Sequence, residues 1–265
     1  MSIHPAAIVD KKAELGAGVS IGPYAVIDED VRIGDNVKIG PHAVIHRHVS
    51  IAEGCAIHAH AVLGDLPQDL VYKDCVSYVR IGAGTTIREG VTIHRGTKPE
   101  TVTETGRECY LMAYSHLAHN VKLGNNVIAC NGALLAGYVQ AGDRVFISGN
   151  CVVHQFVRIG RLAFLGGACG ISKDIPPFCI TRSVTPNQVM GLNVVGMRRA
   201  GLNAGERLAV KRAFAVVYRS GLNTAQALDK LRREEQSALV QEIIAFIDSS
   251  KRGICAFVSG QEAEE

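Results

Sequence analysis

The chain has 265 residues, which is enough for one large or two modest domains with a substantial core. Hydrophobic residues make up 47% of the chain but aromatic residues only 5%, and there are 28 glycines, a composition that indicates a repetitive β architecture with an aliphatic core. The net charge of +3 argues against a nucleic-acid-binding protein, no apolar run is long enough to span a membrane, and the first residues lack the order of a signal peptide.

The eight cysteines are scattered along the chain without a C-x-x-C pair. Such a distribution is typical of a reduced, cytoplasmic protein, in which cysteine serves as a small apolar core residue. We therefore expect no disulfide framework.

An aliphatic residue returns at every sixth position from Ile3 to Leu63. The same phase resumes at Ile81 and again from Leu111 to Ile171. A six-residue repeat predicts a parallel β-helix, in which each hexapeptide supplies one short strand and a turn and three hexapeptides make a coil of 18 residues. One coil cannot bury its own apolar face, so the coils must stack around a continuous core.

Two stretches interrupt the repeat, one near residues 65–79 and the other near 97–109. We expect both to be loops that project from the rigid coil, where loops often carry functional residues. The repeat ends at Lys173–Pro177, because paired prolines remove two backbone donors. The β-helix domain is therefore predicted to span residues 1–190.

Residues 191–265 are predicted to form a small helical domain. After a connecting segment to about residue 203, apolar residues at helical spacing predict a helix around 208–218, a second over 225–234 with Thr224 as its cap, and a third over 237–249.

Positive charge gathers at the start of this helical domain. Between residues 191 and 220 there are six basic residues against one acid, Glu206; they are Arg198, Arg199, Arg207, Lys211, Arg212 and Arg219. Such an excess fits an acidic partner protein, a phosphate group or an ordinary solvated helix face. The last residues, 261–265, are expected to fray.

Stacking arithmetic points to one chemical centre. Residues 18 apart lie about 4.8 Å apart on adjacent coils, so His119, Gly137 and Gln155 form one column, and His116 stands on the same coil as His119. A histidine can act as general base near neutral pH, and a glycine can offer its N–H to a developing oxyanion. This arrangement suits attack of a hydroxyl or an amine on a thioester.

Two other interpretations of the histidines stay open on spacing alone. His94, His116 and His119 could form a three-histidine zinc site, shared across subunits. They could also be surface residues in turns, without a chemical role.

Longer motifs make the pattern specific. They are Gln68–Leu70, Ile87–Glu89, Val91–Thr97, His116–His119, Val153–Phe156, Asp174–Pro177, Gly191–Asn193 and Gly196–Arg199. With these motifs the chain resembles, over essentially its whole length, the acyl-[acyl-carrier-protein]–UDP-N-acetylglucosamine O-acyltransferases of lipid A biosynthesis, which belong to the hexapeptide-repeat acyltransferases.

The resemblance implies a left-handed parallel β-helix, a cytoplasmic homotrimer and active sites between adjacent subunits. The implied reaction moves a 3-hydroxyacyl chain from acyl carrier protein to the 3-position of UDP-N-acetylglucosamine, without a metal or an organic cofactor. The acidic carrier protein would also give the basic patch a partner.

By position, the resemblance makes His119 the general base and Gly137 the oxyanion amide. It makes Gly167, which has no side chain, the residue that sets acyl-chain length. The positions that match contacts to the sugar nucleotide or the donor are Asp69, His94, His116, Tyr138, Gln155, Asn193, Arg198 and Arg199.

The chain departs from the family pattern at four positions. Asn120 stands where an aspartate follows the catalytic histidine, Val71 replaces a lysine, Tyr138 replaces a histidine, and Ala200 ends the basic run. Loss of the lysine charge would favour an acceptor with a 3-amino group, which would give an amide; the alternative is the usual acceptor with neutral drift.

Three further alternatives remain. One is the later N-acyltransferase of the same pathway, which normally has an extra domain before the repeats, whereas here the repeat begins at Ile3. Another is a γ-type carbonic anhydrase with zinc between subunits, and the third is a β-helix scaffold without activity.

Overall fold

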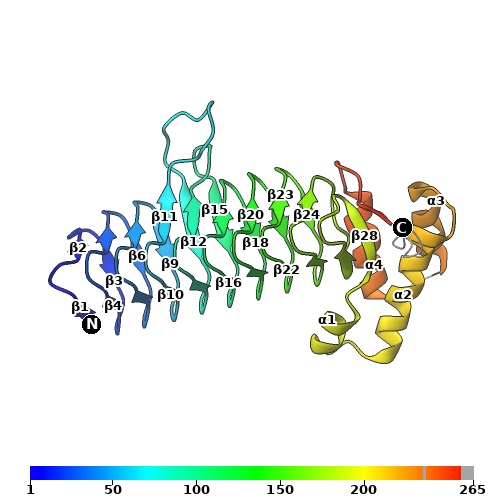
Figure 1. Cartoon of the computed structure of the whole chain (residues 1–265), viewed down its shortest axis with the longest axis horizontal. Coiled ribbons are helices and arrows are strands. Elements are labelled where there is room, and N and C mark those ends of the chain that lie inside the picture. The colour runs from blue at the N-terminus through cyan, green and yellow to red at the C-terminus, as the bar shows by residue number, and fades with distance from the viewer. Residues whose placement is uncertain (235–236, 258–265) are drawn as a thin grey trace.

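The protein is a long prism of stacked coils with helices packed at its C-terminal end (Figure 1). The computed structural model describes residues 1–234 and 237–257. Three sheets, here called A, B and C, form the sides of the prism, and the chain visits them in turn. The predicted β-helix is therefore observed.

The strands of each sheet follow one another at coil intervals. Sheet A contains β1 (Ser2–Ile3), β4 (Ser20–Ile21), β7 (Lys38–Ile39), β10 (Ala56–Ile57), β13 (Thr86–Ile87), β16 (Tyr110–Leu111), β19 (Ile128–Ala129), β22 (Phe146–Ile147), β25 (Phe164–Leu165), β27 (Cys179–Thr181), β28 (Gln188–Leu192) and β29 (Ala256–Phe257). Sheet B contains β2 (Ile8–Val9), β5 (Val26–Ile27), β8 (Val44–Ile45), β11 (Val62–Asp65), β14 (Thr92–His94), β17 (His116–Leu117), β20 (Leu134–Leu135), β23 (Val152–Val153) and β26 (Gly170–Ile171). Sheet C contains β3 (Glu14–Leu15), β6 (Arg32–Ile33), β9 (Val49–Ile51), β12 (Tyr78–Ile81), β15 (Val102–Thr105), β18 (Lys122–Leu123), β21 (Gln140–Ala141) and β24 (Arg158–Ile159).

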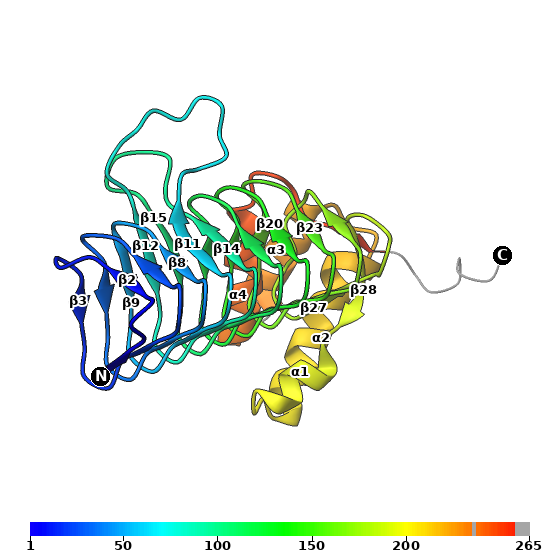
Figure 2. The same ribbon diagram turned by 60° about the vertical axis from the view of Figure 1, so that its left-hand side comes forward.

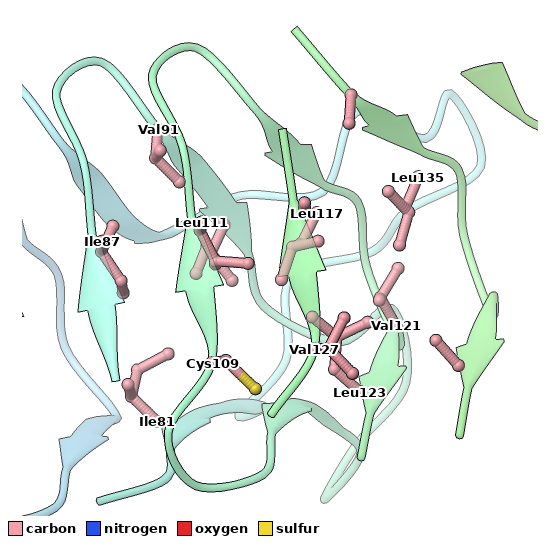
Figure 3. Close-up of a cluster of buried hydrophobic side chains, with 14 of the residues drawn as sticks. Ile81, Ile87, Val91, Cys109, Leu111, Leu117, Val121, Leu123, Val127 and Leu135 are labelled. Atoms are coloured by element: carbon pink, nitrogen blue, oxygen red, sulfur yellow. The ribbon is translucent and has the colours of Figure 1, made fainter. Parts of the chain in front are cut away.

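Most strands of the prism owe their place to one inward aliphatic residue. Leu117 pairs with Ile93 below and Leu135 above, and all three are fully buried. Figure 3 shows such side chains pointing into the interior from all sides. Burying a Leu or Ile side chain contributes about 2 kcal/mol, so the stacked column of them holds the coils together.

The corners of the prism fix the direction of outward side chains. Residues at six-residue intervals adopt the left-handed backbone region, among them Tyr24 (φ 59°), Asn120 (φ 60°) and Tyr138 (φ 62°). This region is strained for residues other than glycine, asparagine and aspartate. The repeated hydrogen bonds between coils, such as Tyr138 N–H to His119 O at 3.0 Å, hold it in place.

The two interruptions lie at one corner, where the first projects far from the prism between β11 and β12 (Figure 2). The second is shorter than the predicted 97–109, because Val102–Thr105 form β15 and pair with β12. Thr103 and Thr105 take the inward positions that aliphatic residues fill elsewhere, and both are buried. The aliphatic repeat therefore does not predict this strand.

The prolines do not end the coil. Pro176 and Pro177 lie in a turn, after which β27 pairs in parallel with β25 at Ile180 and Phe164. The predicted end of stacking at 173–177 is therefore one strand too early, because a turn needs no donor from proline. β28 then pairs antiparallel with β27 and spans the predicted domain boundary at 190/191.

Four helices follow: α1 (Val194–Arg199), α2 (Ala204–Arg219), α3 (Thr224–Glu234) and α4 (Ala238–Asp248). The last three confirm the predicted helices. α1 was not predicted, because it has only six residues and contains a glycine. The cap of α3 is Asn223 and not Thr224, because Asn223 Oδ1 accepts from Gln226 N at 3.0 Å and Gln226 Oε1 accepts from Asn223 N at 3.2 Å.

The helices dock on the last coils of the prism. Leu162 and Phe178 of the prism pack in one buried cluster with Val210, Leu231 and Ile243. β29 returns to pair with β28, so the predicted helical domain shares sheet A with the β-helix. The predicted fraying of residues 261–265 lies outside the described residues.

Two further expectations can be compared with the structure. Six of the eight cysteines are buried, Cys75 and Cys130 are half-buried, and all eight are free thiols, which agrees with the predicted role as apolar filler. Within the described ranges, no helix is long and apolar enough to cross a membrane.

Candidate functional site

A pocket of about 390 Å³ opens on sheet B around the predicted centre. Its polar lining comes from Gln68, His116, His119, His154 and Gln155, and the Gly137 backbone forms part of its wall. Its apolar lining includes Leu134 and Val152, which are 41% and 52% exposed. The pocket therefore joins a histidine and a backbone amide to an accessible apolar surface.

His119 lies directly against the backbone of Gly137. His119 is only 9% exposed, which does not fit the interpretation as a surface turn residue. A Cβ atom added to Gly137 would lie 2.3 Å from Cε1 and 2.5 Å from Nε2 of His119, so only glycine leaves room for the imidazole. The predicted stacking of these two residues is confirmed.

The Gly137 N–H is available to a ligand. The hydrogen bonds between described residues leave it without an acceptor, whereas the next amide, that of Tyr138, donates to His119 O. A free backbone N–H beside a histidine can stabilise a negative oxygen that develops there.

The other face of the His119 ring is supported by neighbouring side chains. Nδ1 lies 3.1 Å from Asn120 Oδ1, and the ring meets Tyr138 edge-on with centroids 5.3 Å apart. Tyr138 in turn stacks on Phe156 at 4.9 Å. These contacts leave Nε2 as the nitrogen that faces Gly137 and the pocket.

His116, which lines the pocket, forms a second pair with His94. Their rings meet edge-on at 4.8 Å, and His116 Nδ1 lies 2.7 Å from Thr92 Oγ1. Burial, with a smaller contribution from His94, lowers the pKa of His116 from 6.5 to about 4, and burial also lowers the pKa of His94. Both rings are therefore neutral at pH 7 and can serve as hydrogen-bonding groups.

The alternative of a zinc site has little geometric support within one chain. Residues 1–234 and 237–257 contain no group of three His, Cys, Asp or Glu side chains that could hold a metal ion. His116 Nδ1 already faces Thr92, and the His94 and His116 rings are inclined by 76°.

The first loop brings Gln68 to the pocket, a residue that sequence reasoning did not single out although it lies in the Gln68–Leu70 motif. Its neighbour Asp69 is half-buried and accepts hydrogen bonds from Val71 N and Tyr72 N at 3.0 Å, which shape the turn of the loop. Val71 itself is 81% exposed.

Asn193 and Arg199 lie elsewhere, on a second cavity of about 640 Å³ over sheet A. Phe146, Phe164 and Val194 give this cavity an apolar lining. The Asn193 side chain accepts from Gly196 N at 2.8 Å and donates to Leu162 O at 2.9 Å, so both of its polar ends hold α1 in place. One chain therefore does not bring these residues to the His119 pocket.

The two remaining predicted site residues are Arg198 and Gly167. Arg198 is exposed on α1. A Cβ atom added to Gly167 would meet only Gly149 O at 3.8 Å and Ser148 Cβ at 3.9 Å, which is ordinary contact, so a side chain would fit there.

Family models match both parts of the chain. A model of bacterial hexapeptide transferases with six repeats matches residues 12–47 and 30–65, and the model described as UDP N-acetylglucosamine O-acyltransferase, domain 2, matches residues 174–255.

Curated relatives and solved structures align with nearly the whole chain. Acyl-[acyl-carrier-protein]–UDP-N-acetylglucosamine O-acyltransferases from Syntrophobacter fumaroxidans and Halorhodospira halophila are 41% and 44% identical, over 96% and 95% of this chain and 99% and 98% of their own lengths. The structure of a UDP-N-acetylglucosamine acyltransferase from Bacteroides fragilis is similar with a TM-score of 0.90 at 38% identity, over 95% of this chain and 98% of that one. The corresponding enzyme from Francisella novicida gives 0.92 at 33% identity, over 98% and 95%.

The coil of hexapeptides and the helical end thus define a hexapeptide-repeat acyltransferase with a left-handed parallel β-helix, as the sequence predicts. More narrowly, the chain belongs to the family of acyl-[acyl-carrier-protein]–UDP-N-acetylglucosamine O-acyltransferases.

Proposed function

We propose that the chain transfers a 3-hydroxyacyl group from acyl carrier protein to the 3-hydroxyl of UDP-N-acetylglucosamine, the first step of lipid A biosynthesis. The family membership supports the substrates. The observation that carries the chemistry is the contact of His119 with the glycine backbone beside a free N–H.

The proposed reaction needs only groups of this chain. His119 Nε2 takes the proton of the sugar 3-hydroxyl while that oxygen attacks the thioester carbon. The negative oxygen of the resulting intermediate is stabilised by the Gly137 N–H. When the intermediate collapses, the carbon–sulfur bond breaks and the imidazolium returns the proton to the leaving thiolate. The imidazole ends as it began, so no cofactor is consumed.

The pocket lining suggests roles for the other residues. Gln68, His116 and Gln155 offer neutral hydrogen-bonding groups for the sugar nucleotide. Leu134 and Val152 offer the acyl chain an apolar surface, and the open position at Gly167 leaves room for a long chain. His94 supports His116 from below, and Asp69 shapes the loop that carries Gln68.

The assembly we propose is a homotrimer with sites between subunits. The His119 pocket lies on sheet B, whereas Asn193 and Arg199 lie over sheet A of the same chain. If a second subunit packs its sheet A against sheet B of the first, one site would contain His119 of one subunit and Asn193 and Arg199 of the other. The exposed residues Arg198, Arg199, Lys211 and Arg212 on α1 and α2 would then receive the acidic carrier protein. The eight free cysteines support a cytoplasmic location.

The uncharged residues Val71 and Tyr138 support a second acceptor, the 3-amino analogue of the sugar nucleotide. Without the lysine that the family pattern places at 71, an ammonium group on the acceptor would meet less electrostatic repulsion. The product would then carry an amide in place of an ester.

One assay separates these alternatives. Purified protein is given a 3-hydroxyacyl carrier protein with UDP-N-acetylglucosamine or its 3-amino analogue, and the products are identified by mass and by their stability to mild base. We expect ester formation from the hydroxyl acceptor; amide formation alone would establish the second acceptor, and no transfer to either would contradict the proposal. Stoichiometric zinc, with activity lost on chelation, would instead favour the carbonic anhydrase alternative.

A further inference from the structure

We propose that a chain of uncharged hydrogen bonds from Tyr138 through Thr97 to Asn120 fixes the tautomer of His119, with its proton on Nδ1 and a free lone pair on Nε2. This inference deepens the proposed function and rests on it, because it concerns how the proposed base is kept ready. It makes Asn120 and Thr97 positioning residues.

The backbone of Thr97 determines which way the Asn120 amide faces. Thr97 N–H can only donate, and it points at Asn120 Oδ1 at a distance of 3.1 Å. The atom that faces it must therefore be the amide oxygen, because the NH₂ group of asparagine has no lone pair to offer.

The same oxygen determines the tautomer of His119. His119 Nδ1 lies 3.1 Å from Asn120 Oδ1, which only accepts hydrogen bonds. Nδ1 must therefore carry a proton, since two lone pairs at this distance would repel. In the neutral ring, Nε2 is then unprotonated, and it is the nitrogen nearest to the Gly137 backbone.

The side chain of Thr97 extends the chain of hydrogen bonds to Tyr138. Thr97 Oγ1 lies 3.1 Å from Asn120 Oδ1 and 2.9 Å from Tyr138 Oη, and in the second contact either hydroxyl can be the donor. The series is made of an amide and two hydroxyl groups and contains no carboxylate and no cation.

The fold holds these groups rigidly. Asn120 is only 6% exposed, and its backbone N–H donates to Thr103 Oγ1 at 2.7 Å. Thr97 belongs to the short loop between β14 and β15, and Tyr138 lies one coil above Asn120. Three separate segments thus meet at the Asn120 side chain and hold it in one orientation. A surface asparagine that rotates freely would not hold the histidine in one tautomer.

The arrangement has a consequence for charge. The titratable groups that face the site are His94 on β14, His116 on β17, Tyr138 after β20 and His154 after β23, and the carboxylate of Asp65 acts on His94. None of them supplies a negative charge at Nδ1, so the imidazolium formed during catalysis is not paired there. A carboxylate at position 120 would hold the proton on the ring to a higher pH.

The test reads the tautomer directly, in the whole protein without substrate. Protein labelled with ¹⁵N-histidine gives two-bond correlations between ring protons and nitrogens, and the His119 signals are assigned by their loss in His119→Ala. We expect the pattern of a neutral ring protonated at Nδ1. A pattern with the proton on Nε2 in the parent protein overturns the proposal, whether or not the protein transfers acyl groups.

Two variants of Asn120 extend the test. Glycine suits the left-handed backbone at this corner, as at Gly90 and Gly132, so Asn120→Gly removes the side chain without backbone strain. We expect the Nδ1–H pattern to be lost and kcat for acyl transfer to fall at least about tenfold, with KM changed less than about twofold. Asn120→Asp should keep the tautomer and move the acid limb of the rate–pH profile up by about one pH unit.

Matched controls separate positioning from general damage. Asn36 has the same left-handed backbone (φ 58°) at a distant corner, so Asn36→Gly should change neither the spectrum nor kcat. Tyr138→Phe should lower kcat by no more than about threefold. Tyr24→Phe, which changes another stacked tyrosine at a corner, should leave kcat unchanged. An unchanged tautomer and kcat in Asn120→Gly would overturn the positioning role, and an unmoved acid limb in Asn120→Asp would contradict the account of charge.

Discussion

Replacing Gly137 by alanine tests the contact on which the proposed chemistry depends. The new Cβ would lie 2.3 Å from Cε1 of His119, and the atoms it meets belong to a buried ring held by Asn120 rather than to a flexible side chain. The ring must move by about 1 Å before the contact between the two carbons becomes ordinary. A displacement of that size at a reacting group costs about 10²-fold in rate, or about 2.7 kcal/mol of barrier.

The assay follows release of carrier-protein thiol at saturating substrates for the parent protein, for Gly137→Ala and for a control, Gly170→Ala. A Cβ at Gly170 meets nothing within 4 Å, so the control adds the same methyl group without a collision. We expect kcat of Gly137→Ala to fall about 10²-fold, with circular dichroism unchanged. A folded Gly137→Ala protein whose kcat stays within about threefold of the parent would refute the reasoning.

The remaining predictions concern stability and chain length. Burial lowers the pKa of His116 to about 4, so below pH 6.5 the unfolded chain binds a proton that the folded chain excludes. The free energy of unfolding is therefore highest above pH 6.5 and falls by about 3 kcal/mol as the pH is lowered toward 4. Denaturant unfolding at both pH values should show a smaller fall in His116→Gln, and an equal fall would contradict the assignment. Arg161 donates to both oxygens of Glu242, so Arg161→Ala should lower the free energy of unfolding by about 1–2 kcal/mol; no change in thermal midpoint would show that this pair does not hold α4. Gly167→Met should shift preference toward shorter acyl chains in competition assays, and an unchanged preference would remove Gly167 from the acyl site.

The fold was predictable because its rule is local and repeated. One inward aliphatic residue in every six specifies the coil, and the structure keeps that register from Ile3 to Ile171. The rule failed where threonines fill the inward positions of β15, since their hydrophobicity is low although they are β-branched and buried. It also failed at α1, whose six residues depend on the Asn193 cap and on packing against the prism.

The candidate site was predictable to the extent that it follows from stacking. The 18-residue coil determines that His119 meets Gly137, and the motif around His119 identifies the residue type. The contacts of Thr97 and Gln68 could not be inferred this way, because both residues reach the site from loops whose paths the repeat does not determine. Whether Asn193 and Arg199 join the same site depends on a second subunit and stays a prediction.

Acyl transfer by His119→Ala tests the central claim most directly. The variant is compared with the parent protein and with His42→Ala, which alters an exposed histidine at a distant corner of the prism. With 3-hydroxyacyl carrier protein and UDP-N-acetylglucosamine, we expect the parent and His42→Ala to form the 3-O-acyl product at equal rates and His119→Ala to be slower by about 10²- to 10⁴-fold. A folded His119→Ala protein that forms this product at the parent's rate would contradict the account.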